Sequence, residues 1–149
     1  LLYMEKMKIF EVKEFDPAYV SIINELLSQL TSSPVPFTDT DLQTMIASGS
    51  SHLFLISCED EIAGMLTVGS YKTPTGQKYW IEDVVVDQRF RGKALGYKLV
   101  DHAIRYVESL GNSILMLTSS PARVAANQLY RSVGFEPKET NVYKMTFKK

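Results

Sequence analysis

The chain has very little cysteine: Cys58 is the only one among its 149 residues. A lone cysteine excludes an internal disulfide and is typical of a reducing compartment, so we expect a cytoplasmic protein. Long apolar runs are also missing, since no uncharged stretch approaches the roughly 20 residues of a membrane-spanning helix. The first residues show no basic stretch followed by an apolar one, the pattern of a secretory signal. These absences exclude a disulfide scaffold and give no reason to expect a membrane partner.

What the chain does contain is an ordinary globular composition. Hydrophobic residues make up 45% and charged residues 22%, with 7 Phe and 8 Tyr. So many aromatic side chains exclude a disordered tail. The length suits one domain with a sizeable core and would be cramped for two. We therefore expect a single domain over residues 1–149.

The charges are unevenly divided, although the net charge is only −1. Residues 1–71 hold three basic against ten acidic side chains, a net of −7, whereas residues 72–149 hold thirteen against seven, a net of +6. A near-neutral total with basic residues spread over several elements argues against nucleic acid as a partner. The asymmetry has two readings: surface drift without function, or two sub-sites of opposite sign, one for an anion and one for a cation.

Hydrophobic periodicity predicts a mixed α/β fold. Expected strands cover residues 7–12, 52–58, 62–71, 79–86, 114–117 and 142–147, with a further strand at Phe135 left open. Expected helices begin at Asp16-Pro17 and at Thr38 or Asp39, and two more cover residues 95–110 and 121–133. The segment 72–78, which holds a proline and a glycine, is expected to be an exposed loop.

The most informative segment is residues 80–96, which read WIEDVVVDQRFRGKALG. A β-branched strand meets a turn rich in arginine and glycine, and a helix starts at once. Gly92 has no Cβ, so a ligand can approach the backbone closely there. The free N–H groups and the dipole of the helix start attract anions, and Arg89, Arg91 and Lys93 surround the same turn. The pattern predicts a phosphate or pyrophosphate site.

Other interpretations of this turn can be compared with it directly. A P-loop needs Ser or Thr after Gly-Lys, but Ala94 follows Gly92-Lys93 here. A dinucleotide fingerprint needs GxGxxG, and its first glycine is missing. The remaining alternative is a solvated loop whose cations bind nothing.

At this point the sequence resembles the GCN5-related N-acetyltransferase (GNAT) superfamily. Residues 89–94, RFRGKA, match its acyl-CoA motif of Gln or Arg, two residues, Gly, one residue, then Gly or Ala. Residues 126–135, ANQLYRSVGF, look like its second signature. The resemblance covers roughly residues 7–147. It implies one N-acetyltransferase domain with a mixed central β-sheet, splayed central strands and about four flanking helices.

The resemblance also implies acetyl-CoA as the acyl donor, with no metal. The backbone of the strand would pair with the pantetheine arm, and the N–H groups of the turn would cradle the pyrophosphate. Tyr130 would protonate the departing thiolate. The residues so assigned to the donor are Val84, Val85, Val86, Arg89, Arg91, Gly92, Lys93, Ala94, Leu95, Gly96, Asn127 and Tyr130.

A general base is also expected, because an ammonium acceptor must lose a proton before it attacks. Glu82 and Asp83 both lie in the strand that would meet the donor. Strand alternation places Glu82 on one face with Val84 and Val86, and Asp83 on the other. Members of the family commonly have a bulge in this strand, which would swap the faces. We favour Glu82, with Asp83 or neither residue as alternatives.

The function expected from these residues is acetyl transfer to a primary amine by direct attack in a ternary complex. Sequence offers no Cys–His or Ser–His pair for an acyl-enzyme route, and His52, His102 and Cys58 are expected to be structural. The acidic half favours a small cationic amine, bound near residues 31–40 and 71–78. Alternatives are a peptide or protein acceptor, or a non-catalytic CoA-binding module on the same fold. A homodimer is compatible with the sequence.

Overall fold

The computed structural model describes residues 6–148. They form two compact units, the first ending at Thr118 and the second beginning at Ser119, and each unit is described by itself. Of the helices in the described part of the chain, none combines the length and apolar composition that crossing a membrane requires.

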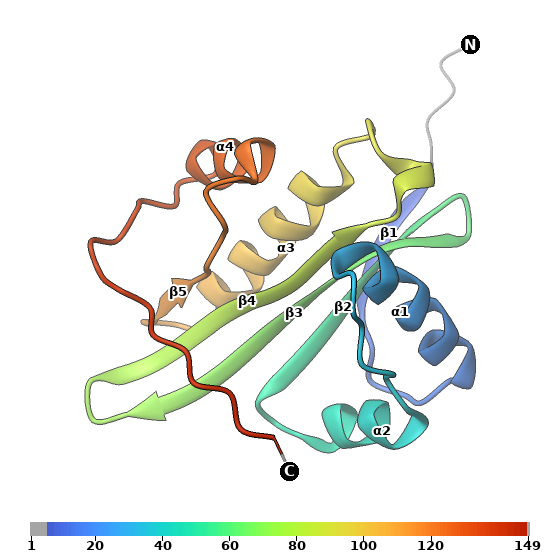
Figure 1. Ribbon diagram of the computed structural model, residues 1–149, viewed down its shortest axis with the longest axis horizontal. Helices are drawn as coiled ribbons and strands as arrows, with labels where there is room; N and C mark the ends of the chain where they lie inside the picture. Colours follow the sequence, from blue (N-terminus) through green and yellow to red (C-terminus); the bar gives the residue numbers. More distant parts are fainter. Residues whose placement is uncertain (1–5, 149) are drawn as a thin grey trace. The chain divides into compact units, whose positions relative to one another are not determined.

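The first unit is built on a five-stranded sheet in the order β1-β2-β3-β4-β5 (Figure 1). The first four strands pair antiparallel with their neighbours, and β4 pairs parallel with β5, so the sheet is mixed. The strands are β1 (Met7–Glu11), β2 (Ser51–Cys58), β3 (Glu61–Thr73), β4 (Gly76–Val86) and β5 (Ile114–Met116). The predicted mixed α/β class is confirmed.

Three helices accompany this sheet, and their first residues explain where they begin. In α1 (Pro17–Leu30), Asp16 accepts a hydrogen bond from the Ala18 N–H at 2.9 Å and proline occupies the first turn. In α2 (Asp39–Ala47), Thr38 and Asp41 form a reciprocal capping box. The third helix, α3 (Leu95–Ser109), follows a short 3₁₀ turn at Gln88–Phe90 and has no side-chain cap.

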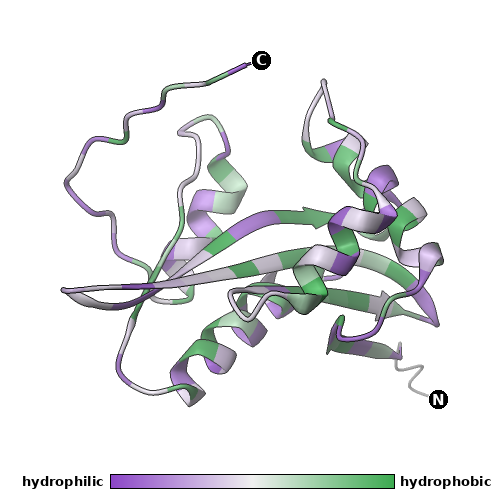
Figure 2. Cartoon of the chain, turned by 90° about the horizontal axis from the view of Figure 1, so that it is seen from below, coloured by the Kyte–Doolittle hydropathy of each residue, from purple (hydrophilic) through white to green (hydrophobic). Residues whose placement is uncertain are grey.

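The two faces of the sheet have different covers. One core cluster joins Leu53, Leu55, Met65 and Val85 of the strands to apolar residues of α1 and α2. On the opposite face a Cβ added to Gly64 would lie 3.3 Å from Leu99 of α3. In Figure 2 the strands and the helices both carry green hydrophobic and purple hydrophilic segments. Helix α3 buries Leu95, Leu99, Val100, Ala103 and Val107, a stripe with helical spacing.

The second unit contains one helix, α4 (Val124–Ser132). Its C-terminus is a Schellman motif, because the Gly134 N–H donates to Arg131 O at 3.1 Å and the Phe135 N–H donates to Tyr130 O at 3.0 Å. Gly134 has φ +110, the left-handed conformation that this motif places after a helix and that glycine adopts without strain.

Two parts of the expected layout are wrong. Residues 72–78 are not a loop, because β3 continues to Thr73 and β4 begins at Gly76, so a tight turn joins two long strands. No strand forms at Phe135 or over residues 142–147 in the described chain. Alternation shows only that residues 142–147 can be extended, whereas a strand also needs a paired edge. The apolar side chains there are largely exposed: Val142, Tyr143, Met145 and Phe147.

Candidate active site

The start of α3 is the only helix start of the first unit without a side-chain cap in the described chain. Gly92 has φ +86 and the capping residue Ala94 has φ +60, so two left-handed residues flank Lys93. Alternation of this kind turns successive N–H groups toward one side and forms a concave anion-binding nest. A Cβ added to Gly92 would meet nothing within 4 Å. A phosphate can therefore approach the backbone N–H groups of residues 91–96 without meeting a side chain at Gly92.

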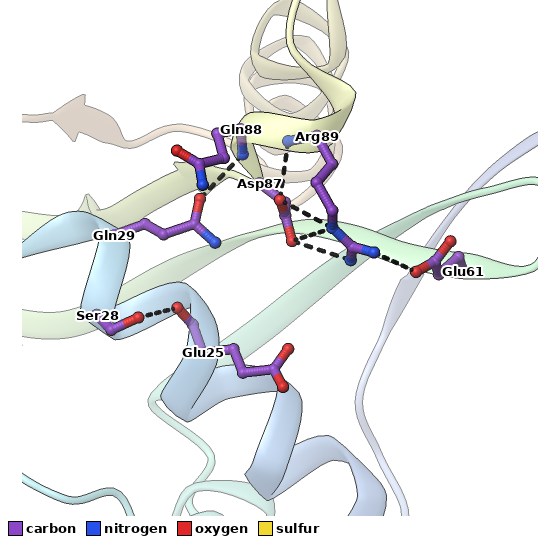
Figure 3. Close-up of polar contacts among 7 residues, drawn as sticks. All are labelled: Glu25, Ser28, Gln29, Glu61, Asp87, Gln88 and Arg89. Carbon is purple, nitrogen blue, oxygen red and sulfur yellow. Dashed lines mark hydrogen bonds and ion pairs between the residues drawn. The ribbon is translucent and has the colours of Figure 1, made fainter.

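The guanidinium of Arg89 is held by carboxylates, which the sequence did not indicate (Figure 3). Arg89 donates from Nε and Nη2 to the buried carboxylate of Asp87, and from Nη1 to Glu61 at 2.8 Å. The Arg89 N–H also donates to Asp87 Oδ1 at 2.9 Å. These hydrogen bonds from Arg89 lower the pKa of Asp87, and the two carboxylates raise the pKa of Arg89. Arg89 thus connects the 3₁₀ turn Gln88–Phe90 to Asp87 and to Glu61 of β3.

A further hydrogen bond joins the 3₁₀ turn Gln88–Phe90 to α1. The N–H of Gln88 donates to Gln29 Oε1 at 2.9 Å, and Gln29 lies in the last turn of α1 (Figure 3). Gln29, Glu61 and Asp87 were not expected at the site. Only Asp87 carried a signal that could have found it, an acidic residue directly before a 3₁₀ turn. The other two are brought there by tertiary contacts.

The remaining cations of the turn are Arg91 and Lys93. Arg91 is exposed, and its side chain forms no hydrogen bond or ion pair with the residues that the structure describes. It can therefore turn toward an incoming anion without breaking a contact. Arg89 is thus bound to carboxylates, whereas the side chain of Arg91 has no such partner among the described residues.

The edge of β4 beyond Trp80 is left open on the β5 side. Strand β5 pairs with β4 only at Lys78, Tyr79 and Trp80, and the first residues of β4 thus hold all of this pairing (Figure 1). On its other edge β4 remains paired with β3 as far as Val86. The backbone groups of residues 81–86 that face β5 can thus pair with an extended ligand, as an added strand would. Val84, Val85 and Val86 lie in this stretch.

A bulge in β4 changes which residues share a face. Met65 of β3 pairs with Val85 and Thr67 pairs with Glu82, so Asp83 and Val84 together oppose a single residue. Asp83 has φ +51, which is uncommon for a non-glycine residue. The alternation expected from sequence is therefore wrong here: Glu82 lies on the face of Val85, not with Val84 and Val86. That face is the one covered by α1 and α2.

The environment of Glu82 changes the acidity of its carboxyl group. Partial burial raises the pKa of Glu82, and the neighbouring charge of Asp83 raises it further. A raised pKa makes a carboxylate a stronger base once it is ionised, which suits proton removal near neutral pH.

The second signature occupies α4, and its residues pack on one another. Tyr130 meets Phe135 edge-on, with ring centroids 6.1 Å apart, which is the apolar contact that accompanies a Schellman motif. Burial raises the pKa of Tyr130, and Arg123 opposes the shift. Asn127 Nδ2 donates to Ser120 O and to Arg123 O, both at 2.9 Å. Burial thus disfavours the ionised form of Tyr130, and the amide hydrogens of Asn127 bind backbone carbonyls of the loop before the helix.

His52, His102 and Cys58 were expected to be structural. His52 forms a hydrogen bond of 2.9 Å to Glu11, and its ring contacts Tyr106. His102 packs edge-on against Phe54, and Cys58 is buried. No cluster of three or more His, Cys, Asp or Glu side chains suited to a metal occurs among the described residues.

Comparison with known proteins places this arrangement in a family. The model of the acetyltransferase (GNAT) family matches residues 20–135. Glucosamine 6-phosphate N-acetyltransferase of Arabidopsis thaliana is 25% identical over 145 residues, which is 93% of this chain and 95% of that protein. The crystal structure of glucosamine-6-phosphate N-acetyltransferase from Arabidopsis thaliana has a TM-score of 0.78 at 30% identity, covering 95% of this chain and 99% of that chain.

A more distant structure shares the fold. An aminoglycoside N-acetyltransferase solved in complex with CoA has a TM-score of 0.77 at 14% identity, with 98% of each chain covered. The family model and the relatives named N-acetyltransferases identify the chain as an acyltransferase. The chain belongs to the acetyltransferase (GNAT) family, whose members use acetyl-CoA as the donor.

Proposed function

We propose that the chain transfers the acetyl group of acetyl-CoA to a small primary amine, by direct attack in a ternary complex. The observation that carries the proposal is one continuous path. The open edge of β4 over residues 81–86 leads directly into the uncapped turn at residues 91–96. An extended arm fits the first part and a pyrophosphate fits the second. The proposal takes residues 1–149 as one catalytic domain in the cytoplasm.

The donor would be held mainly by backbone groups. The N–H groups of residues 91–96, with Gly92, Lys93, Ala94, Leu95 and Gly96 among them, would bind the pyrophosphate. The groups of Val84, Val85 and Val86 would pair with the pantetheine arm. Arg91 would add charge, while Arg89 would keep the turn in shape. The Oδ1 atom of Asn127, whose amide hydrogens are engaged, would be the part of that side chain left for the donor.

The chemical step moves one acetyl group and two protons. The neutral amine nitrogen attacks the thioester carbonyl carbon, the C–N bond forms, and the C–S bond breaks. Glu82, directly or through water, takes the proton that the ammonium must lose, with Asp83 as the alternative base. An N–H of the Val84–Val86 stretch polarises the carbonyl oxygen. Tyr130 gives its proton to the departing thiolate. The nitrogen, which carries an excess proton after the attack, returns that proton to the Tyr130 phenolate directly or through water, so that the amide and the thiol are both neutral.

Amino sugars are the first acceptors to test. The relatives from Arabidopsis thaliana and Oryza sativa are both named for glucosamine 6-phosphate, at 25% and 27% identity. An amino sugar is also a compact cationic amine, which the acidic N-terminal half favours. A peptide acceptor is the second candidate, because a lysine side chain is equally cationic.

The decisive experiment follows release of CoA thiol while acetyl-CoA is offered with amino sugars, aminoglycosides, polyamines and lysine peptides. We expect saturable turnover of a small amine, with intersecting rather than parallel double-reciprocal lines. Binding of CoA without turnover of any amine would instead support the non-catalytic module. Parallel lines would contradict direct transfer.

Two substitutions assign the proton steps. Tyr130→Phe should lower kcat by about 10²–10⁴-fold, the usual contribution of a general acid, with the KM for acetyl-CoA little changed. Glu82→Gln should lower kcat/KM and remove its acid limb. The raised pKa of Glu82 places that limb above the pH at which an ordinary glutamate titrates, and activity is lost as pH falls through it. Asp83→Asn is the matched comparison: it should keep the limb but move it to lower pH, because the charge of Asp83 contributes to the raised pKa of Glu82. Loss of the limb in Asp83→Asn would assign the base to Asp83 instead.

A further inference from the structure

One row of residues on β4 begins at the proposed base Glu82 and continues to Trp80, which has no role so far. Trp80 and Glu82 are alternate residues of this strand and share one face. Trp80 pairs with Gly69 of β3, and Glu82 pairs with Thr67. Residues directly opposite one another in an antiparallel pair share a face, so all four side-chain positions lie together. Along β4, the Cα atoms of Trp80 and Glu82 are separated by about 6.7 Å, the rise of two strand residues.

This face is the one that α1 and α2 cover nearer the other end of the strands. Thr67 pairs with Leu53 of β2, and Leu53 belongs to the core cluster formed with these helices. The next pair along the sheet, Trp80 and Gly69, lies beyond that core residue, toward the turn between β3 and β4. The row therefore runs from the edge of the core outward along the sheet.

Trp80 is held in a fixed orientation. Its Nε1 donates to the hydroxyl of Tyr71 at 3.1 Å, and Tyr71 remains 47% exposed. On the β5 side Trp80 pairs in register with the partly buried Met116. Because the indole N–H already has a partner, what the ring offers to a ligand is its flat apolar surface.

The space beside the indole is open. Gly69 lies directly opposite Trp80, and a Cβ built on Gly69 meets nothing within 4 Å. A side chain at this position would lie next to the ring, since opposite Cβ atoms in such pairs are about 4.5–5.5 Å apart. The absence of one leaves room over the sheet for a ligand that stacks on Trp80.

We infer that Trp80, Tyr71 and Gly69 form the platform for the acceptor, which is an amine carried on a saturated ring. The apolar face of the ring lies on the indole and the ammonium is directed toward Glu82. The inference rests on the proposed function and specifies its acceptor site. Aromatic faces attract both apolar ring surfaces and nearby cations. A rigid ring loses less conformational entropy on such a surface than a flexible chain does.

The single tryptophan of the chain makes the platform directly observable. Indole fluorescence of the full chain is recorded with saturating CoA, which cannot donate an acetyl group, while amines are added. The probes are two matched pairs, glucosamine against open-chain glucamine and cyclohexylamine against hexylamine. We expect saturable quenching or a spectral shift with the ring amine of at least one pair, roughly three- to thirtyfold tighter than with its open-chain counterpart.

Two variants test the platform without removing the indole. Gly69→Val adds a side chain where nothing lies within 4 Å, in a strand position that suits valine, so the fold is preserved. It should raise the acceptor KM about tenfold or more with the KM for acetyl-CoA unchanged. Tyr71→Phe frees the indole N–H and should raise the acceptor KM less. Tyr106→Phe, which removes a hydroxyl from α3 on the opposite face, should change neither constant.

Each outcome decides between the two proposals. Equal binding of ring and open-chain amines, or an unchanged acceptor KM in Gly69→Val, overturns the platform while leaving acetyl transfer intact. Failure of every amine to release CoA thiol overturns the proposed function, and the fluorescence titration still tests the platform. An absence of any fluorescence response to a ring amine that is turned over also overturns the platform.

Discussion

The N-termini of α2 and α3 make opposite uses of the same unsatisfied backbone groups. Helix α2 closes its own start: Thr38 accepts from the Asp41 N–H at 3.1 Å, and Asp41 accepts from the Thr38 N–H at 2.8 Å. Helix α3 begins at Leu95, and the residue before it, Ala94, is in the left-handed conformation and provides no side-chain cap. A helix that caps itself has little left for an external anion, whereas an uncapped start can bind one.

The surroundings of the two starts follow the same division. The first turn of α2 carries acidic residues, Asp39 and Asp41, and the hydrogen bonds from Thr38 lower the pKa of Asp41. The approach to α3 carries Arg91 and Lys93 and no acid in its first turn. The acidic side chains at the start of α2 offset the positive end of that helix dipole. At the start of α3 the side chains are cationic, so the positive end of its dipole can attract an anionic ligand. The N-terminus of α2 thus stabilises its own helix, whereas the N-terminus of α3 is the one that we propose for the donor.

The largest expected effect comes from giving α3 the acid that α2 has. Ala94→Asp tolerates the left-handed conformation but places a carboxylate where a pyrophosphate would bind. We expect the Kd for CoA to rise about 100-fold, because like charges held together cost several kcal/mol. Ala94→Asn, which has the same shape without the charge, is the control and should stay within about threefold. Calorimetry measures both, and an equal loss in the two variants would assign the effect to shape.

A smaller loss is expected from Gly92→Val. Gly92 has φ +86, so valine strains the turn and its side chain occupies the approach to the backbone. We expect the Kd for CoA to rise about tenfold, equivalent to about 1.4 kcal/mol. Gly111→Val is the matched control, since Gly111 has φ +103 and open space but lies beyond the other end of α3. It should lower the melting temperature similarly and leave CoA affinity unchanged; equal affinity losses would remove Gly92 from the site.

Arg91→Gln should produce a still smaller change. An exposed charge contact contributes up to about 1 kcal/mol, so the Kd for CoA should rise about two- to fivefold. The difference from the wild type should shrink at high salt, because exposed charges are screened. Arg105→Gln, on the exposed face of α3 beside Asp101, is the control and should leave affinity unchanged. A salt-independent loss would contradict a direct phosphate contact.

The smallest effect on affinity is expected at α2. Thr38→Ala removes the cap and should lower the free energy of unfolding by about 1 kcal/mol, measured by urea denaturation. The Kd for CoA should not change, because this helix start already satisfies itself. A clear loss of CoA affinity would mean that the N-terminus of α2 influences CoA binding. It would contradict the assignment of stability to α2 and of binding to α3.

Much of the site was predictable because its signals are local. A β-branched strand, a turn with Gly92 and an amphipathic helix follow one another within residues 80–96, and each needs only short-range preferences. The second signature is equally local. Gly134 and Phe135 complete a Schellman motif on α4, and that motif sets Tyr130 against Phe135. Local hydrogen bonding fixes such motifs whatever lies around them.

Other features depended on pairing between distant segments. The bulge at Asp83 moves Glu82 onto the face of Val85, and only the register with β3 reveals it. The brace of Arg89 needs Glu61, which is 28 positions away, and the tie from Gln88 needs Gln29, which is 59 positions away. Residues 142–147 alternate like a strand and form none in the described chain, because extension without a paired edge is not a strand.

The amino-acid sequence alone was enough for the fold class, the family and the position of the glycine turn before α3, because helix starts, left-handed turns and amphipathic faces are fixed by neighbours along the chain. The tertiary structure decided which cation braces the turn and which is free, which carboxylate shares a face with the core, and that Trp80 lies opposite an open position at Gly69. These properties depend on strand register and on contacts across tens of residues, and a side chain's chemistry does not specify its distant partner.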